Sequence, residues 1–154
     1  MKLATLCYII DKNADKTLML HRVKKINDIH EGKWNGLGGK MEAGESPEDC
    51  IIREVREESG LTIKAPKLHG FITFPAFDSQ EDWYVFIFTA TEFEGSLIDS
   101  NEGVLKWIDT NKVPDLNLWD GDKIFLKWLR QDKFFSAKFN YDKGEFLDYK
   151  VCFY

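Results

Sequence analysis

A glycine-rich segment that leads into an acidic helix is the feature of this sequence that most restricts its fold. The sequence predicts a helix over Pro47–Ser59, because Ser46 is a good N-cap and a proline at the first helical position loses no hydrogen bond. Gly60 is a natural end for this helix, since glycine adopts a left-handed conformation without a Cβ clash. The chain must therefore pass from the glycine-rich segment directly into a helix with well-defined ends.

Two stripes of side chains run along this predicted helix. One is apolar and should face the core, and it consists of Ile51, Ile52 and Val55. The other carries three carboxylates spaced i, i+3 and i+4, namely Glu54, Glu57 and Glu58. Three adjacent carboxylates repel one another, and no lysine or arginine follows in the next turn to relieve them. A bound Mg²⁺ or Mn²⁺ ion would do so, because both ions prefer oxygen ligands.

The alternative to a metal site is a solvated acidic face. The segment before the helix, Trp34-Asn-Gly-Leu-Gly-Gly-Lys40, favours the metal site, because glycines let the backbone approach a ligand closely.

The fixed positions of this segment resemble those of a known family. They match the Nudix box, G-x5-E-x7-R-E-U-x-E-E-x-G-U with U aliphatic, at Gly39, Glu45, Arg53-Glu54-Val55, Glu57-Glu58, Gly60 and Leu61. The resemblance implies that the three helix glutamates bind divalent metal ions on a diphosphate, and that a backbone carbonyl near Gly38 completes the metal shell. It also implies that Arg53 braces the cluster through ion pairs and that Glu45 supports it, with Gly39 and Gly60 in structural roles.

The resemblance extends to the reaction. A glutamate of the box would act as general base, and Glu54 and Glu58 rank ahead of Glu57 for this role. Water would attack the β-phosphorus and release a nucleoside monophosphate and pyrophosphate. Glu102, in the segment Asp99-Ser-Asn-Glu-Gly103, is the candidate for one further metal ligand, since family members supply an acid from this region. A solvated loop acid is the alternative for Glu102.

Segments outside the box resemble the MutT-type oxidised-purine nucleoside triphosphatases. They are Trp34–Lys40, Trp119-Asp-Gly-Asp122 and Leu147-Asp-Tyr149. Asn35 suits base reading, because an amide both donates and accepts along one edge of a base. Trp119 offers a flat face for stacking a base, and Phe74 could close the other side, so we expect a purine site at these residues. For Trp119 the alternative is a core aromatic at a helix start.

The acid pair expected next to this tryptophan is incomplete. In the mammalian enzyme two adjacent aspartates follow the tryptophan after one residue, whereas this chain has Gly121 and then Asp122. Asp120 lies one position earlier, and it is a second candidate for the missing acid. A helix cap is the alternative for Asp122. The preferred substrate is therefore expected to be an oxidised purine triphosphate such as 8-oxo-dGTP, while the departure at Gly121 leaves the base open.

Other functions stay open at this point. The box itself specifies only a diphosphate next to another group, so ADP-ribose, a dinucleoside polyphosphate or a capped RNA are alternative substrates. A catalytically silent domain that senses a nucleotide is the alternative outside the enzymes. The chain retains every carboxylate of the box, which favours the enzyme.

Composition restricts partners and location. The chain has 154 residues, 44% hydrophobic and 31% charged, which suits one globular domain over 1–154. A net charge of −5 argues against a binder of nucleic acid polymers. Three scattered cysteines predict reduced thiols in a cytoplasmic protein. The apolar run Leu3–Ile10 is too short to span a bilayer, and we expect a monomer without membrane contact.

Strand and helix signals alternate along the chain. Strands are predicted at Leu3–Ile10, Thr17–Arg22, Leu61–Ile63, Lys67–Phe74, Asp82–Glu92, Val104–Ile108, Phe134–Tyr141 and Phe146–Phe153. A second helix is predicted at Asp122–Arg130, while Lys24–Lys33 and Asn111–Leu118 read as loops. This order predicts an α/β/α sandwich over a mixed sheet, which is also the Nudix fold. His21, His30 and His69 read as structural or surface residues. Lys24 and Lys25 read as a solvated charge run, with a position facing the phosphates as the alternative.

Overall fold

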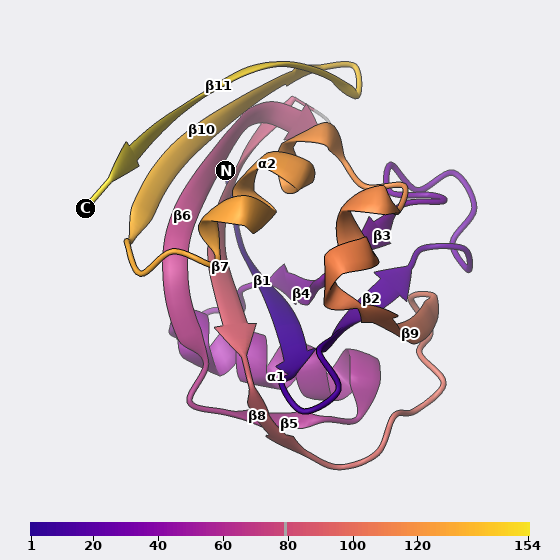
Figure 1. Ribbon diagram of the computed structural model, residues 1–154. Coiled ribbons are helices and arrows are strands. Elements are labelled where there is room, and N and C mark those ends of the chain that lie inside the picture. The colour runs from indigo at the N-terminus through magenta and orange to yellow at the C-terminus, as the bar shows by residue number, and fades with distance from the viewer. Residues whose placement is uncertain (79) are drawn as a thin grey trace.

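A large mixed β-sheet is the middle layer of the protein in the computed structural model, which describes residues 1–78 and 80–154 (Figure 1). Its strands are β1 (Lys2–Asp11), β2 (Lys16–His21), β3 (Trp34–Asn35), β4 (Leu37–Lys40), β6 (Lys67–Asp78), β7 (Glu81–Ala90), β9 (Val104–Asp109), β10 (Phe135–Asp142) and β11 (Glu145–Phe153). Within the described residues these nine strands follow the order β11-β10-β6-β7-β1-β2-β3, with β4 added on β1 and β9 on β2. The pairs β1–β7 and β6–β10 are parallel, and the other pairs are antiparallel.

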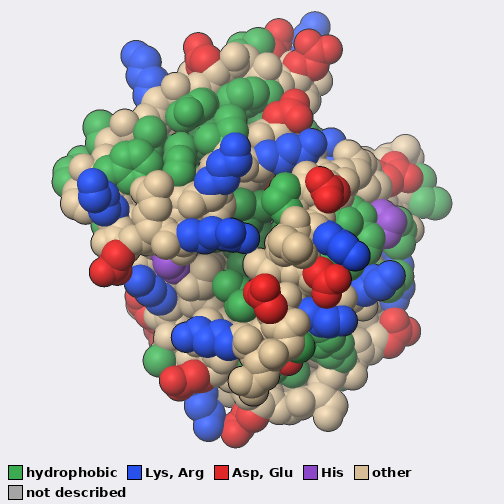
Figure 2. Space-filling view, in the orientation of Figure 1, with side chains coloured by type: hydrophobic (Ala, Val, Ile, Leu, Met, Phe, Trp, Pro, Cys, Tyr) green, Lys and Arg blue, Asp and Glu red, His purple; other side chains and the backbone are tan. Residues whose placement is uncertain are grey.

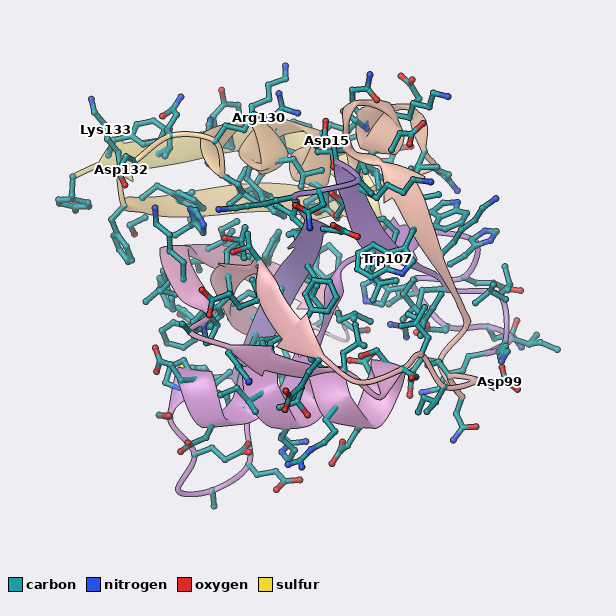
Figure 3. The ribbon with its side chains drawn as sticks, turned by 60° about the horizontal axis from the view of Figure 1, so that its bottom comes forward. Asp15, Asp99, Trp107, Arg130, Asp132 and Lys133 are labelled. Atoms are coloured by element: carbon teal, nitrogen blue, oxygen red, sulfur yellow. The ribbon has the colours of Figure 1, made fainter. Side chains whose placement is uncertain are left out.

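Two helices cover opposite faces of this sheet, α1 (Pro47–Ser59) and α2 (Asp120–Trp128) (Figures 1 and 3). Each face has its own hydrophobic core. Ile51 and Val55 of α1 pack with β-strand residues in one core, and Phe125 and Trp128 of α2 pack in the other. The α/β/α sandwich over a mixed sheet is therefore confirmed. A small second sheet, β5 (Thr62–Lys64) with β8 (Glu92–Glu94), and the 3₁₀ helix η1 (Thr110–Asp115) complete the elements.

Local sequence determines the ends of α1. The Ser46 hydroxyl accepts the Asp49 N–H, and the Asp49 carboxylate accepts the Ser46 N–H, which makes a capping box. Gly60 ends the helix at φ 82°, in the left-handed region. A Cβ at Gly60 would also meet the Ser96 carbonyl oxygen at 2.5 Å. Both the left-handed backbone and the lack of space for a side chain therefore require glycine at this position. The predicted helix Pro47–Ser59 is confirmed at both ends.

The glycine-rich segment before α1 forms strands rather than an open loop. β4 pairs with β1, and Gly38 lies opposite Leu6. A Cβ on Gly38 would collide with the Thr5 carbonyl oxygen, so β4 can lie this close to β1 only with glycine at that position. The interpretation of Trp34–Lys40 as a glycine-rich loop was wrong, because the segment forms β3 and β4 and Gly38 allows β4 to pack on β1.

Three other element boundaries differ from the sequence prediction. The second helix begins two residues earlier than predicted and ends at Trp128. Strand β6 continues past Phe74 to Asp78, which extends the β6–β7 hairpin over the site described below. The predicted loop over Asn111–Leu118 begins as η1, which accommodates Pro114. Each difference arises where tertiary packing, and not local sequence preference, decides the boundary.

Hydrophobic side chains also gather on the outside, over the C-terminal hairpin in the upper part of Figure 2. The large exposed ones in this region are Phe134, Leu147, Tyr149, Phe153 and Tyr154. No helix among the described residues is long and apolar enough to cross a membrane.

Candidate active site

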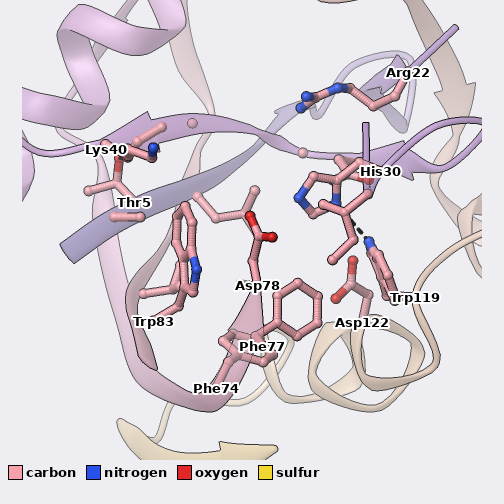
Figure 4. Close-up of a pocket in the computed structure, with 18 of the residues that line it drawn as sticks. Thr5, Arg22, His30, Lys40, Phe74, Phe77, Asp78, Trp83, Trp119 and Asp122 are labelled. Atoms are coloured by element: carbon pink, nitrogen blue, oxygen red, sulfur yellow. Dashed lines mark hydrogen bonds between the residues drawn. The ribbon is translucent and has the colours of Figure 1, made fainter. Parts of the chain in front are cut away.

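A cavity of about 520 Å³ lies between α1, the sheet and α2. One part of its wall is acidic and carries Glu54, Glu58 and Glu102. Another part is aromatic and carries Phe74, Phe77, Trp119 and Tyr141, with Asn35 and Asp122 among them (Figure 4). The cavity therefore joins most of the residues that the sequence predicted for metal and for base, while Glu57 and Asp120 do not line it.

Arg53 is the centre of an ion-pair network beside the acidic wall. Its Nε and Nη2 donate to the two carboxylate oxygens of Glu45 at 2.7 and 2.9 Å. Its Nη1 donates to Glu54 at 2.8 Å and to Glu57 at 3.3 Å. The hydrogen bonds from Arg53 lower the pKa of Glu45 to about 2. Arg53 thus holds three carboxylates in place, in the way that the resemblance implied.

Glu58 is the most buried of the three helix glutamates, with 7% of its surface exposed. Its carboxylate accepts the Gly38 N–H at 3.0 Å, which orients it towards the cavity wall. Burial raises the pKa of Glu58 to about 8, and the nearby charges of Glu54 and Glu102 act in the same direction. Burial likewise raises the pKa of Glu54. The fold therefore brings the carboxyl groups of Glu54 and Glu58 together at a place where water solvates their ionised forms poorly.

Glu57 and Glu102 lie at the edge of this cluster. The Glu57 side chain is 59% exposed and is bound only to Arg53 among the described residues. Glu102 pairs with Lys25 at 2.8 Å and with Arg22 at 3.6 Å. Lys25 thus belongs to the cavity wall and not to a solvated charge run.

The carboxylates fit a hard divalent cation by their chemistry. Each offers oxygen ligands, and the mutual repulsion of Glu54, Glu58 and Glu102 would be relieved by a positive ion. Among the described residues, however, no three His, Cys, Asp or Glu side chains converge closely enough to hold a metal as they stand.

Trp119 stands at the aromatic end, immediately before α2. Its Nε1 donates to His30 Nδ1 at 2.8 Å. Burial lowers the pKa of His30, which keeps the ring neutral and able to accept this bond. Phe77 and Tyr141 meet the indole edge-on, with centroid distances of 5.1 and 5.6 Å. These contacts fix the plane of Trp119 as a wall of the cavity. The sequence alone had left open the alternative that Trp119 is an aromatic residue of the core.

Two polar side chains, Asn35 and Asp122, line the cavity near this aromatic wall. The Asn35 Oδ1 atom is buried and accepts no hydrogen bond among the described residues. Asp122 is 8% exposed, and burial raises its pKa to about 7. Asp122 is not a helix cap, because it is the third residue of α2 and no side-chain bond caps that helix. Asp120 is exposed and does not line the cavity, so it does not replace the acid missing at Gly121.

Several cavity residues escaped the sequence analysis. Phe77, Trp83 and Tyr141 lie on the extended β6–β7 hairpin and on β10, far from the Nudix box in sequence. His30 was read as structural or surface, and it lines the cavity instead. His69, which hydrogen-bonds Thr89 at 2.6 Å, is buried and structural as predicted. The aromatic pattern continues past Phe74 to Phe77, and this signal could have predicted a longer hairpin with Phe77 on it.

Comparison with known proteins agrees with this geometry. The sequence matches the family described as the NUDIX domain over residues 1–129. The chain belongs to the Nudix hydrolase family. An uncharacterized Nudix hydrolase, YvcI of Bacillus subtilis, is 35% identical over 89% of this chain and 87% of its own length. An oxidized purine nucleoside triphosphate hydrolase of Mus musculus is 36% identical over 78% of each chain.

A solved structure agrees as well. The MutT protein from Bacillus halodurans has a TM-score of 0.86 and 35% identity, over 98% of this chain and 97% of its own. Nudix hydrolases generally use divalent metal ions, and the acidic wall of this Nudix chain contains the box glutamates.

Proposed function

We propose that this Nudix hydrolase is a Mg²⁺-dependent nucleoside triphosphate diphosphohydrolase. Its preferred substrates would be oxidised purine nucleotides such as 8-oxo-dGTP, and its products the nucleoside monophosphate and pyrophosphate. The protein would thereby remove damaged nucleotides from the cytoplasmic pool. Three free cysteines, two of them buried, fit a reducing compartment.

The observation that carries this proposal is the shared cavity. The acidic wall with Glu54 and Glu58 and the aromatic wall with Trp119 belong to one space of about 520 Å³, within the range of small-ligand sites. A nucleotide has the same two-part character, with a charged phosphate chain and a flat base. Relatives named as oxidized purine nucleoside triphosphate hydrolases, from mouse and zebrafish, support the purine assignment.

Residues at the acidic wall would hold the ion and handle the proton. Glu54, Glu57, Glu58 and Glu102 with the Gly38 carbonyl are the candidate ligands. When bound, Mg²⁺ would neutralise the phosphates and lower the pKa of a bound water towards neutral. Glu58 is our candidate for the general base, because it is buried at the cavity wall and the Gly38 N–H orients its carboxylate. Arg53 would keep Glu54 directed at the same point.

Residues at the aromatic wall would bind the base. Trp119 and Phe74 would enclose its faces, while Asn35 and Asp122 would meet its edge. The unpaired Asn35 Oδ1 suits an amino or ring N–H of a purine. Asp122 would accept a hydrogen bond when ionised and donate one when protonated, and both states occur near neutral pH.

A product assay tests this function. Purified protein would be incubated with Mg²⁺ and, in parallel, 8-oxo-dGTP, dGTP or ADP-ribose, with products separated by chromatography. We expect monophosphate and pyrophosphate, with 8-oxo-dGTP preferred. Equal cleavage of both triphosphates would keep the reaction and remove the oxidised-base preference, and turnover of ADP-ribose alone would overturn the substrate class.

The same assay tests the metal assignment. Glu58→Gln removes one ligand charge and should lower kcat by more than about 100-fold, a loss of the size seen when a key electrostatic group is removed. Glu48→Gln, on the first turn of the same helix and away from the cavity, should leave kcat unchanged. Full Mg²⁺-dependent turnover by Glu58→Gln would exclude Glu58 from the site.

A further inference from the structure

Gly121 leaves room at the first turn of α2 for a hydroxyl group from another strand. The Gly121 N–H donates to the Tyr141 hydroxyl at 2.7 Å. A Cβ on Gly121 would lie 2.6 Å from the same hydroxyl oxygen and 2.9 Å from Phe139 Cδ1. Any side chain at position 121 would therefore displace Tyr141. The tyrosine occupies the place next to Asp122 where the sequence resemblance led us to expect a second acid.

Aromatic neighbours hold Tyr141 in this place. Phe77 and Trp119 meet its ring edge-on at centroid distances of 5.2 and 5.6 Å, and Phe146 packs at 5.4 Å. Tyr141 itself lines the cavity. Its hydroxyl is therefore fixed at the aromatic end by groups that also form the walls of the base site.

The hydroxyl has hydrogen-bonding capacity to spare. A tyrosine hydroxyl donates one hydrogen bond besides those it accepts. The Gly121 N–H uses its acceptor side, and no acceptor among the described residues takes its proton. Burial raises the pKa of Tyr141, so the proton stays on the oxygen throughout the neutral range. A fixed, protonated donor, unused among the described residues, thus lies next to the first turn of α2, on a residue that lines the cavity with Asp122.

We propose that Tyr141 is a specificity-determining residue, whose O–H donates to a carbonyl oxygen of the bound purine, O6 or O8. The inference rests on the proposed function. Where an acid at position 121 would present an acceptor, this chain presents a donor, so its base site favours purines with a carbonyl at the contacted edge. Asp122 beside it supplies the complementary acceptor when it is ionised.

Four deoxynucleoside monophosphates separate this role from a structural one. 8-oxo-dGMP carries O6 and O8, dGMP only O6, 8-oxo-dAMP only O8, and the 2-aminopurine nucleotide neither. Dissociation constants measured by calorimetry do not require turnover. For Tyr141→Phe we expect about 3- to 10-fold weaker binding of the nucleotides that carry the contacted oxygen. This range of about 3- to 10-fold corresponds to the net free energy that one hydrogen bond contributes to binding. Binding of the 2-aminopurine nucleotide should be unchanged.

A second variant and a control complete the test. Gly121→Ala keeps the hydroxyl but pushes it away, and it should show the same selective loss. Tyr149→Phe makes the same chemical change on the neighbouring strand, outside the cavity, and should change no dissociation constant. An equal loss for all four nucleotides in Tyr141→Phe would show a merely structural role, and no loss would also overturn the proposal. Failure of the wild type to bind any of them would overturn the proposed substrate class itself.

Discussion

At the scale of single residues, Asp122 is a carboxyl group whose ionisation the fold opposes. Burial raises its pKa from 3.8 to about 7, so the unfolded chain ionises first as pH rises. The stability it contributes is complete below about pH 4 and is lost as pH rises towards 7. Asp122→Asn cannot ionise and should escape this loss. Between pH 4 and pH 8, the unfolding free energy of the wild type should therefore fall by about 4 kcal/mol relative to that of the variant.

Urea unfolding at a series of pH values between 4 and 8 measures this difference. Asp120→Asn, at the exposed neighbouring acid, is the matched control and should follow the wild-type curve. Parallel curves for wild type and Asp122→Asn would mean that Asp122 is solvated and not held in the cavity wall.

Arg53 shows that a residue of the box acts through geometry as well as charge. Its planar fork reaches Glu45 twice and also Glu54 and Glu57. A lysine keeps the charge but has no such fork, so Arg53→Lys should release Glu54 from its position. We expect kcat/KM to fall about 10- to 100-fold, with a higher Mg²⁺ requirement, as for lost partners of metal ligands. Mg²⁺ titration of initial rates measures both effects.

Arg56→Lys is the control for this change, three residues later on the exposed side of the same helix. It should retain wild-type kinetics. A comparable loss in both variants would assign the effect to helix stability and not to the glutamate cluster.

At the scale of elements, the approach of β4 to α1 depends on Gly39. A Cβ there would lie 2.5 Å from the carboxyl carbon of Glu54. Gly39→Ala should therefore turn the flexible Glu54 side chain away from the cavity, while the backbone stays in place. We predict a fall in kcat/KM of about 10- to 100-fold with little change in unfolding free energy. Rates and urea unfolding of the same preparation measure the two quantities.

A double variant makes this prediction specific. If Gly39→Ala acts only by displacing Glu54, then adding it to Glu54→Gln should cause little further loss of kcat/KM. Losses that multiply in the double variant would show that Gly39→Ala disturbs the site by another route.

The elements also show what the sequence could predict. Ser46, Pro47 and Gly60 act on their immediate neighbours, so both ends of α1 followed from local rules. The second helix was placed two residues late, because no side chain caps it and packing of Asp122 into the cavity decides its start. The glycines of β4 read as loop residues because the requirement for them comes from distant segments, from Thr5 of β1 for Gly38 and from Glu54 of α1 for Gly39.

At the scale of the whole molecule, the site combines segments that are far apart in sequence. The Nudix box predicted its acidic wall, since Arg53 and the glutamates lie on one helix. The aromatic wall needs contacts such as Trp119 with His30, which are 89 residues apart. No local pattern encodes such a pairing, and Tyr141 escaped the sequence analysis for the same reason. Family resemblance supplied Asn35, Phe74 and Trp119, whereas the departure at Gly121 became interpretable only beside Tyr141.

The charge gathered at the acidic wall should make the stability of the whole protein depend on metal. Glu54 lies close to Glu58, and its charge adds to the effect of burial that raises the pKa of Glu58. In EDTA, stability should fall as pH rises from about 4.5 to about 8, because the unfolded chain ionises this glutamate first while the folded protein keeps Glu58 protonated up to its raised pKa. We expect Mg²⁺ to bind the folded site and not the dispersed glutamates of the unfolded chain. At a concentration of 100 Kd it should therefore add about 2.7 kcal/mol, or several degrees in Tm.

The stabilisation by Mg²⁺ should also grow between pH 6.5 and 8.5, because the ion competes with the proton for Glu58. Thermal unfolding in Mg²⁺ and in EDTA across this range measures it. Glu58→Gln should lose most of the metal-dependent shift in Tm and its pH dependence, while Glu48→Gln should keep both. If Mg²⁺ raised Tm equally in all three proteins, the ion would be acting on general surface charge, and the acidic wall would have no special affinity for it.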